Sequence, residues 1–200
     1  ETKNFICGEG GALVLNDPRD VERAHVLLDK GTNRRQFLQG QVDKYTWTDL
    51  GSSFGLSDLL AAYLTAQLER RDQVLRKRRA VFEGYWDRLV PHADPALFRL
   101  PTVPADRDQA FHMFYVLLPD RERRDAMLES LRADGIGATF HYVPLHSSTA
   151  GRRFAARETP CPVTDEISGR LLRLPFFNSI DDATLDRVCT SFLAAVGAAR

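Results

Sequence analysis

The first apolar block of the chain is short and predicts a buried strand. Ala12–Leu15 lies between two glycines and an Asn-Asp-Pro sequence, which is how a strand covered on both faces is bounded. Such a strand needs neighbours to pair with. The adjacent sequence supplies none, so we expect the partners of this strand to lie upstream.

A helix is predicted next, followed by a long loop. Asp17 can cap a helix that has Pro18 at its first position, and Gly31 is placed where a helix stops. We therefore expect a helix over residues 18–30. Residues 31–52 are rich in Gly, Gln, Asn, Thr and Ser, and predict an irregular connecting segment.

The longest helical pattern begins at Ser57 and runs to about Leu89, where Pro91 ends it. A helix of this length usually links two lobes, so we expect domains over residues 1–70 and 71–200. The middle of the helix carries a basic cluster, expected to be a solvated face. The cluster comprises Arg70, Arg71, Arg76, Lys77, Arg78 and Arg79.

The second domain is predicted to be a small α/β sandwich, with helices against a short sheet. The expected strands are Leu97–Val103, Phe111–Leu118 and Ile136–Phe140, and the expected helices are Arg121–Asp134 (stopped by Gly135), 163–172 and 182–197. Tyr142–Ser148 is expected to be a loop. The last helix has the clearest apolar stripe in the chain.

Composition and charge narrow the class of protein without identifying it. The chain is 44% hydrophobic and 27% charged, with 27 basic and 27 acidic side chains. No net field favours nucleic acid or an anionic membrane, and no apolar run is long enough for a membrane span. The N-terminus resembles no signal peptide, and Cys7, Cys161 and Cys189 form no CxxC pair. We expect reduced thiols in a cytoplasmic protein.

Several motifs in order give the chain a specific resemblance. They are Glu1-Thr2-Lys3-Asn4-Phe5-Ile6-Cys7-Gly8-Glu9-Gly10-Gly11, Gly31-Thr32-Asn33-Arg34, the run 41–53, Ser57-Asp58-Leu59-Leu60-Ala61-Ala62, and His141-Tyr142-Val143-Pro144-Leu145-His146. Together they resemble the DegT/DnrJ/EryC1/StrS family of sugar aminotransferases, which depend on pyridoxal 5′-phosphate (PLP). The runs before residue 68 are most similar to the branch that aminates dTDP-4-keto-6-deoxyglucose at its keto carbon.

The resemblance implies an α/β PLP-dependent transferase fold, aspartate aminotransferase-like and of fold type I. Residues 1–70 would be the end of its large, PLP-binding domain, and residues 71–200 its small C-terminal domain. The implied activity is transfer of an amino group, with L-glutamate as the expected donor, to a nucleotide-linked keto sugar. The implied assembly is a homodimer whose active sites are shared. The ring-stacking aromatic, the Asp at the pyridine nitrogen and most phosphate contacts would lie in the missing half, so we expect the isolated chain to be inactive.

Lys3 is the residue to which the resemblance assigns the chemistry. A lysine amine condenses with the aldehyde of PLP to a Schiff base, and the freed amine can then move a proton as general base and acid. Relatives that dehydrate sugars carry His at this position, so a lysine favours transamination.

The remaining site residues are also implied by the resemblance. Ser53 aligns with a residue that reaches the cofactor phosphate of the neighbouring subunit, and its hydroxyl can donate a hydrogen bond. Arg34 and Lys44 are candidates for the nucleotide diphosphate. Tyr142 and His146 belong to the loop that approaches the sugar.

Other interpretations of the same residues stay open. Gly8-Glu9-Gly10-Gly11 lacks the ending of a P-loop and precedes a strand, so a tight turn is expected instead. The two histidines of the 141–146 run have no third metal ligand at a recognised spacing, and Ser147-Ser148 has no nucleophile elbow. Within the same fold, the alternative is another keto-sugar aminotransferase or a related PLP-dependent sugar-modifying enzyme. A non-catalytic module that binds nucleotide sugars or serves in assembly is the alternative of a different class.

Overall fold

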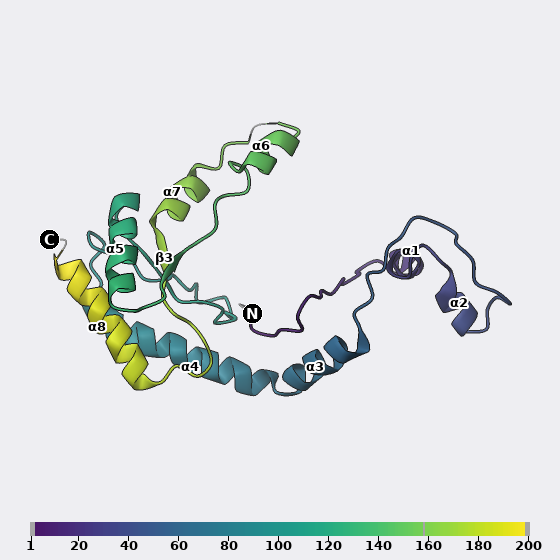
Figure 1. The fold of residues 1–200 in the computed structure, drawn as a ribbon, viewed down its shortest axis with the longest axis horizontal. Helices are drawn as coiled ribbons and strands as arrows, with labels where there is room; N and C mark the ends of the chain where they lie inside the picture. The colour runs from purple at the N-terminus through teal and green to yellow at the C-terminus, as the bar shows by residue number, and fades with distance from the viewer. Residues whose placement is uncertain (1–2, 158, 199–200) are drawn as a thin grey trace. The chain divides into compact units, whose positions relative to one another are not determined.

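The computed structural model of the protein describes residues 3–157 and 159–198. It divides into two compact units, Glu1–Arg71 and Asp72–Arg200, and each is described by itself (Figure 1). Within the described residues no helix is long and apolar enough to cross a bilayer.

Two helical segments of the first unit begin at side-chain caps that the sequence supplies. The 3₁₀-helix η1 spans Pro18–Asp20 and α1 spans Val21–Leu28. The Asp17 carboxylate accepts from the Arg19 N–H. α3 spans Asp58–Glu69, and the Ser57 hydroxyl accepts from the Leu60 N–H. Both predicted helix starts are confirmed, because each cap satisfies an N–H that the helix leaves unpaired.

Gly31 ends the first helical region through its backbone conformation. Its φ is 75°, and that of Lys30 before it is 61°. A Cβ added at Gly31 would lie 1.8 Å from the Asp49 carbonyl oxygen, so only glycine fits. Thr48 N–H donates to the Gly31 oxygen at 2.8 Å. The loop prediction for residues 31–52 was incomplete, because this close approach orders the segment and a short helix, α2 (Arg34–Leu38), lies within it.

The buried strand predicted at Ala12–Leu15 was wrong for this chain. The segment has no ladder hydrogen bonds, and Leu13 and Val14 are 76% and 79% exposed. No described residue pairs with it, and a strand without partners leaves its backbone groups and side chains to solvent. Its side chains line a groove of about 570 Å³ with residues of α1 and with Phe54.

The single long helix predicted from Ser57 to Leu89 is two helices. α3 ends at Glu69, and Arg70, with φ −102° and ψ 14°, leaves the helical region. α4 then spans Arg71–Leu89 and is followed by the 3₁₀-helix η2 over Val90–His92.

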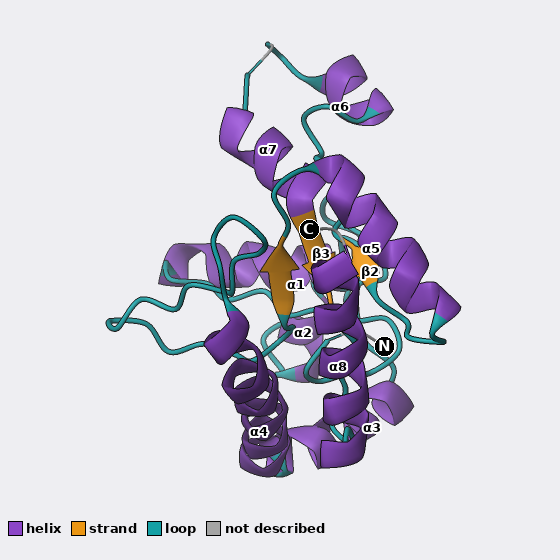
Figure 2. Ribbon diagram, turned by 90° about the vertical axis from the view of Figure 1, so that its left-hand side faces the viewer, coloured by secondary structure: helices purple, strands orange, loops and turns teal. Residues whose placement is uncertain are grey.

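The second unit contains a three-stranded antiparallel sheet in the order β1-β3-β2 (Figure 2). The strands are β1 (Tyr115–Leu117), β2 (Thr139–Phe140) and β3 (Leu171–Arg173). In the register, Tyr115 and Thr139 both pair with Arg173. Two predictions were wrong. Residues 97–103 contribute only the bridge from Arg99 to Leu117, and the central strand β3 occupies residues that were expected to end a helix.

Helices of the second unit follow the prediction more closely. α5 spans Arg121–Ala133, α6 Thr149–Phe154, α7 Pro162–Arg170 and α8 Asp182–Ala198. α5 packs against α7, α8 and β3. Gly135 has φ 71° just beyond α5, which confirms its predicted role as a helix stop. α6 was not predicted.

Aromatic side chains hold the core of the second unit together. Phe114, before β1, contacts Phe82 and Tyr85 of α4 with ring centroids 5.0 Å apart in each pair. Phe98 meets Phe192 of α8 edge to face at 5.1 Å. Such pairs add to the free energy of apolar burial. The buried cluster extends from Val81 to Val196, so the packed core belongs to this unit.

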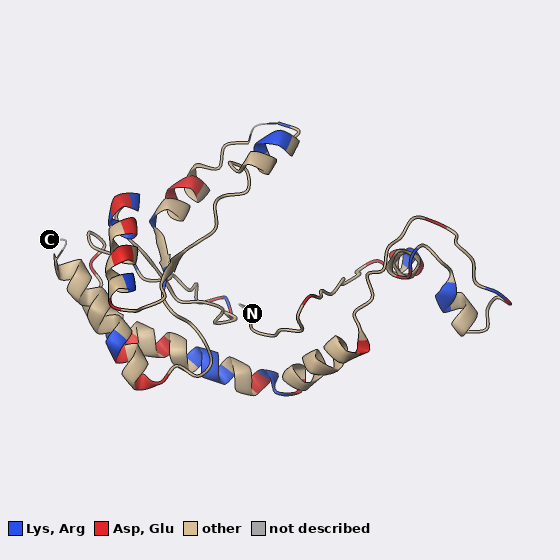
Figure 3. Cartoon of the chain, in the orientation of Figure 1, with Lys and Arg blue, Asp and Glu red and all other residues tan. Residues whose placement is uncertain are grey.

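Arg78 is buried, so the expectation that the whole basic cluster is solvated was wrong for this residue. Figure 3 shows by colour that Lys and Arg positions gather along α4. Arg78 among them is only 5% exposed. Its guanidinium donates to the Phe111 oxygen at 2.8 Å, to the His112 oxygen and to Asn178 Oδ1 at 3.3 Å. It is buried because these acceptors, distant in sequence, satisfy its donors.

Candidate functional site

Lys3 is exposed, and the chain just after it is fixed to α3. The Ile6 N–H donates to Gln67 Oε1 at 3.0 Å, and Gln67 Nε2 donates back to the Ile6 oxygen. Lys3 itself makes no hydrogen bond or ion pair with any described residue. An accessible, unengaged amine close to an anchored backbone is what covalent attachment of an aldehyde requires.

The glycine-rich turn that follows is built around Cys7 and α3. Gly8 has φ 74°, which supports the tight-turn interpretation for this glycine. A Cβ on Gly10 would lie 2.7 Å from Cys7 Sγ and 3.1 Å from Leu56 Cδ1. The missing side chain at Gly10 therefore lets the turn close over the buried thiol.

Ser53 and Arg34 meet at a common residue, Asp29. The Ser53 backbone forms an antiparallel bridge with Asp29, and Arg34 Nη1 lies 3.5 Å from Asp29 Oδ2. The Ser53 side chain is exposed, so its hydroxyl is available as a donor, whereas Arg34 already has a carboxylate partner. No hydrogen bond or ion pair joins Lys3 to either residue in the part of the chain that the structure describes.

Tyr142 and His146 lie on one loop of the second unit and have different surroundings. The Tyr142 ring is 68% exposed and lies 5.6 Å from the Arg173 guanidinium. His146 Nε2 lies 3.1 Å from Asp165 Oδ1. Of the two residues, only Tyr142 lines the cavity between α5 and α7. His146 lines a separate one of about 530 Å³.

The geometry of this loop argues against hydrolysis and metal binding. Ser147 Oγ donates to the Pro144 oxygen at 3.3 Å and Ser148 Oγ to the Leu145 oxygen at 2.7 Å. Neither hydroxyl bonds to His146 in the described residues, so the histidine has no nucleophile to activate. Within the same residues no His, Cys, Asp and Glu group could hold a metal ion.

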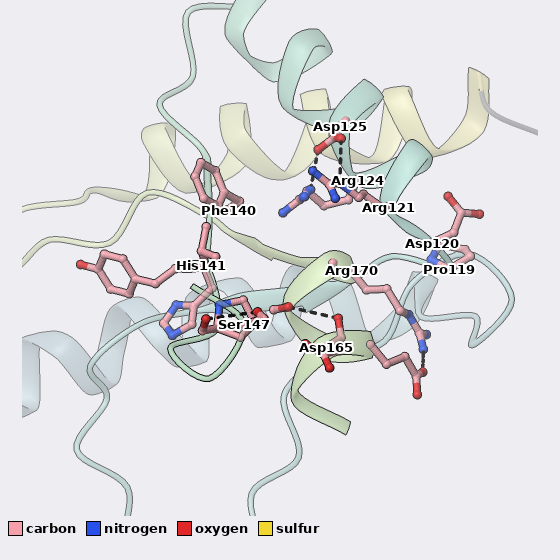
Figure 4. A pocket seen from close by; sticks show the side chains of 16 residues that line it. Pro119, Asp120, Arg121, Arg124, Asp125, Phe140, His141, Ser147, Asp165 and Arg170 are labelled. Atoms are coloured by element: carbon pink, nitrogen blue, oxygen red, sulfur yellow. Dashed lines mark hydrogen bonds and ion pairs between the residues drawn. The ribbon is translucent and has the colours of Figure 1, made fainter. Parts of the chain in front are cut away.

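The cavity beside Tyr142, which we call the α5–α7 cavity, has a volume of about 820 Å³ (Figure 4). Arg124 and Asp125 of α5 lie on one side and Asp165 and Arg170 of α7 on the other, with Phe140 and His141 beside them. Sequence reasoning missed Arg124, Phe140 and Arg170. These residues come from separate elements, and no spacing in the sequence brings them together.

Electrostatics in this cavity are set by buried nitrogen atoms. Burial, and to a smaller extent Arg173, lowers the pKa of His141, which favours the neutral ring. Two nitrogen atoms of residues that line the cavity, His141 Nδ1 and Arg124 Nη1, are buried without a hydrogen-bond partner in the described residues. The cavity wall therefore offers more hydrogen-bonding capacity than its own residues use.

Comparison with known proteins identifies the fold and the family. A family model, the DegT/DnrJ/EryC1/StrS aminotransferase family, matches residues 1–193. The chain belongs to this family. Among solved structures, the aminotransferase TlmJ from Streptoalloteichus hindustanus is 27% identical, with a TM-score of 0.82 over 98% of this chain and 50% of that one. The sugar aminotransferase CalS13 from Micromonospora echinospora is 22% identical, with a TM-score of 0.78 over 96% and 49%.

Family membership confirms the PLP-dependent transferase fold and shows that PLP is the cofactor of the family. Aminotransferases of this family act with PLP, and Spr1654 from Streptococcus pneumoniae has been solved in a PLP-form. That protein is 16% identical over 98% of this chain and 50% of its own length, with a TM-score of 0.76, and shows the fold alone. The chain spans about half the length of these relatives. Its residues fit the cofactor at Lys3, through an unengaged amine, and at Ser53, through an unengaged hydroxyl.

Proposed function

We propose that this chain is the part of a sugar aminotransferase that carries the reactive lysine, and that Lys3 is this lysine. The observation that supports it most is the family match over residues 1–193, which includes Lys3-Asn4 and the Gly8–Gly11 turn. The exposed, unengaged amine of Lys3 is consistent with that role.

Each candidate site residue has its own chemical or binding role in this proposal. Lys3 would hold the cofactor through its amine, and the free Nζ would take a proton from the α-carbon of the amino donor. PLP, when bound, would supply the electron sink that makes this proton transfer possible. Ser53 donates a hydrogen bond to the phosphate, Arg34 and Lys44 attract the nucleotide diphosphate, and Tyr142 and His146 contact the sugar.

We further propose the substrate class and the assembly that the motifs favour. The acceptor is a nucleotide-linked keto deoxysugar, dTDP-4-keto-6-deoxyglucose in the first instance, and the donor is L-glutamate. The full protein is a homodimer with shared active sites. The thiols of Cys7, Cys161 and Cys189 are free, which is consistent with the reducing cytoplasm.

Attachment of the cofactor tests the role of Lys3 directly. PLP is added to the chain and to a longer protein that contains it, the visible imine band is recorded, and borohydride reduction fixes the adduct for peptide mapping. We expect modification at Lys3 in the longer protein and loss of the band in Lys3→Ala, with Lys77→Ala as the matched control on the exposed face of α4. Modification that maps elsewhere overturns the assignment.

Activity tests the substrate class separately. The longer protein is incubated with L-glutamate and a panel of nucleotide keto sugars, and amino sugar products are measured. Amination of a dTDP-linked keto sugar is expected. A protein that carries PLP at Lys3 but aminates no sugar in the panel contradicts the substrate class and favours a binding or assembly module.

A further inference from the structure

Arg124 is a buried cation whose hydrogen-bonding capacity is only partly used. It lies near the start of α5, which begins at Arg121, and is 5% exposed. Its Nε donates to Asp125 Oδ1 at 2.7 Å, while its Nη1 is buried with no partner among residues 3–157 and 159–198. Burying a guanidinium N–H without an acceptor is unfavourable, so an acceptor supplied by a ligand would be bound strongly at this point.

The charge of Arg124 is only partly compensated, although the wall as a whole carries four carboxylates (Asp120, Asp125, Asp165 and Glu166) and three guanidinium groups (Arg121, Arg124 and Arg170). Asp125 is the only carboxylate paired with it in the described residues, and the same carboxylate lies 3.7 Å from Arg121 Nε. One negative charge is therefore shared by two guanidinium groups. The other acids of the wall are engaged elsewhere: Glu166 with Arg170, Asp165 with His146, and Asp120 with the Arg123 N–H at the start of α5.

Apolar surfaces surround this charge. The Phe140 ring lies under the guanidinium, with its centroid 5.6 Å from Arg124 Cζ, and is 48% exposed. Pro119, Val143 and Pro144 complete the apolar part of the wall. Because Nη1 is closed to solvent, a ligand reaches it by displacing a neighbour, such as the half-exposed Phe140 ring. A cation beside an aromatic ring and two proline rings suits an anion that carries an apolar body.

We propose that the α5–α7 cavity binds a small organic carboxylate, with its carboxylate on the Arg124 guanidinium and its apolar body against Phe140 and the prolines. Planar, charge-assisted pairing is the mode in which Arg recognises carboxylates. The cavity shares Tyr142 with the loop proposed to contact the sugar, but the carboxylate site on Arg124 goes beyond the aminotransferase function because it needs neither Lys3 nor a cofactor.

Nuclear magnetic resonance with benzoate as the probe tests this site. We expect saturable shifts of the Arg124 Nε–H and Phe140 ring signals, with a dissociation constant on the order of 1 mM for a ligand of this size. Benzamide has the same shape without the charge and should bind at least about tenfold more weakly. Equal shifts with benzamide, or benzoate shifts that map outside the cavity, overturn the proposal.

Two pairs of variants separate the site from general effects on the fold. Arg124→Gln should weaken benzoate binding about tenfold or more, whereas Arg132→Gln, on the exposed last turn of the same helix, should not. Val143→Asp places a carboxylate on an exposed position of the wall (63% exposed) and should weaken binding roughly threefold by repulsion. Val163→Asp, at a 72% exposed position of α7 outside the wall, should leave binding unchanged. Unaltered binding in a folded Val143→Asp protein contradicts the site even if Arg124→Gln does not fold.

Discussion

The side chain of Gln67 pairs with both backbone polar groups of Ile6. Ile6 N–H donates to Gln67 Oε1 at 3.0 Å, and Gln67 Nε2 donates to the Ile6 oxygen. The side-chain amide of Gln67 thereby makes the two backbone hydrogen bonds that a neighbouring strand would make with Ile6. Since Ile6 lies three positions after Lys3, this pair fixes the backbone close to the proposed reactive lysine.

Gln67→Ala should free this segment without unfolding the rest of the chain. Each lost hydrogen bond is worth about 0.5–1.5 kcal/mol net, so hydrogen exchange at the Ile6 amide should accelerate roughly tenfold or more. Gln73→Ala, at an exposed position of α4, is the control and should leave that amide unchanged. An Ile6 amide that exchanges equally fast in the two variants would show that the pairing does not persist in solution.

Arg78→Ala should strongly destabilise the second unit. The guanidinium satisfies the oxygens of Phe111 and His112, and it supports Phe111 in the unusual φ of 47°, which costs a non-glycine residue free energy. We expect the free energy of unfolding to fall by about 2–4 kcal/mol, measured by urea titration with Trp86 fluorescence.

Arg79→Ala is the matched control for Arg78. Arg79 is exposed and pairs with Glu83 one turn along α4 at 2.7 Å, and such solvent-exposed ion pairs contribute little to stability. A loss at Arg78 no larger than the loss at Arg79 would contradict a structural role for the buried guanidinium.

The contrast between Ser57 and Leu171 shows how far the sequence determines this fold. Ser57 is followed by a helix-forming run and caps α3 through its own side chain, so a local signal suffices. Leu171–Arg173 continues the apolar pattern of α7 and becomes a strand only because it lies between β1 and β2. A strand of three residues is too short to show the alternation of apolar and polar positions by which strands are recognised, and its partners are distant in sequence.

Candidate site residues divide in the same way. Lys3 stands in a run of motifs and could be chosen from the sequence alone. Arg124 could not, because its importance lies in an unpaired buried nitrogen, which depends on Phe140 and on the elements that close over it. Burial of this kind is a property of packing, and a charged residue on a predicted helix is expected to be solvated.

Cys189 should resist alkylation in the folded protein. It is 3% exposed, and burial raises the pKa of its thiol to about 11, although Arg88 acts in the opposite direction. At pH 8 only about one such thiol in a thousand is ionised. Cys161 is half-buried and should react first. Mass spectrometry of iodoacetamide-treated protein, with and without urea, measures both sites. Cys189 modified as fast as Cys161 without urea would contradict this burial.

His141 should make the stability of the second unit depend on pH. Burial, followed by the charge of Arg173, lowers its pKa in the folded state from about 6.5 in an unfolded chain. Between the two pKa values the unfolded state binds more protons, so the free energy of unfolding decreases as pH falls through this window. The contribution is fully present above the unfolded pKa and is lost below the folded one.

His141→Gln should remove that part of the pH dependence. Urea unfolding at about pH 7.5 and about pH 5.5 brackets the titration of an ordinary histidine, and the loss of stability between the two should be smaller in the variant than in the parent chain. His92→Gln, at an exposed position of η2, is the control and should keep the parent's dependence. Because the carboxylates titrate alike in all three proteins, a His141→Gln chain that loses as much stability as the parent would show that His141 is protonated equally in both states.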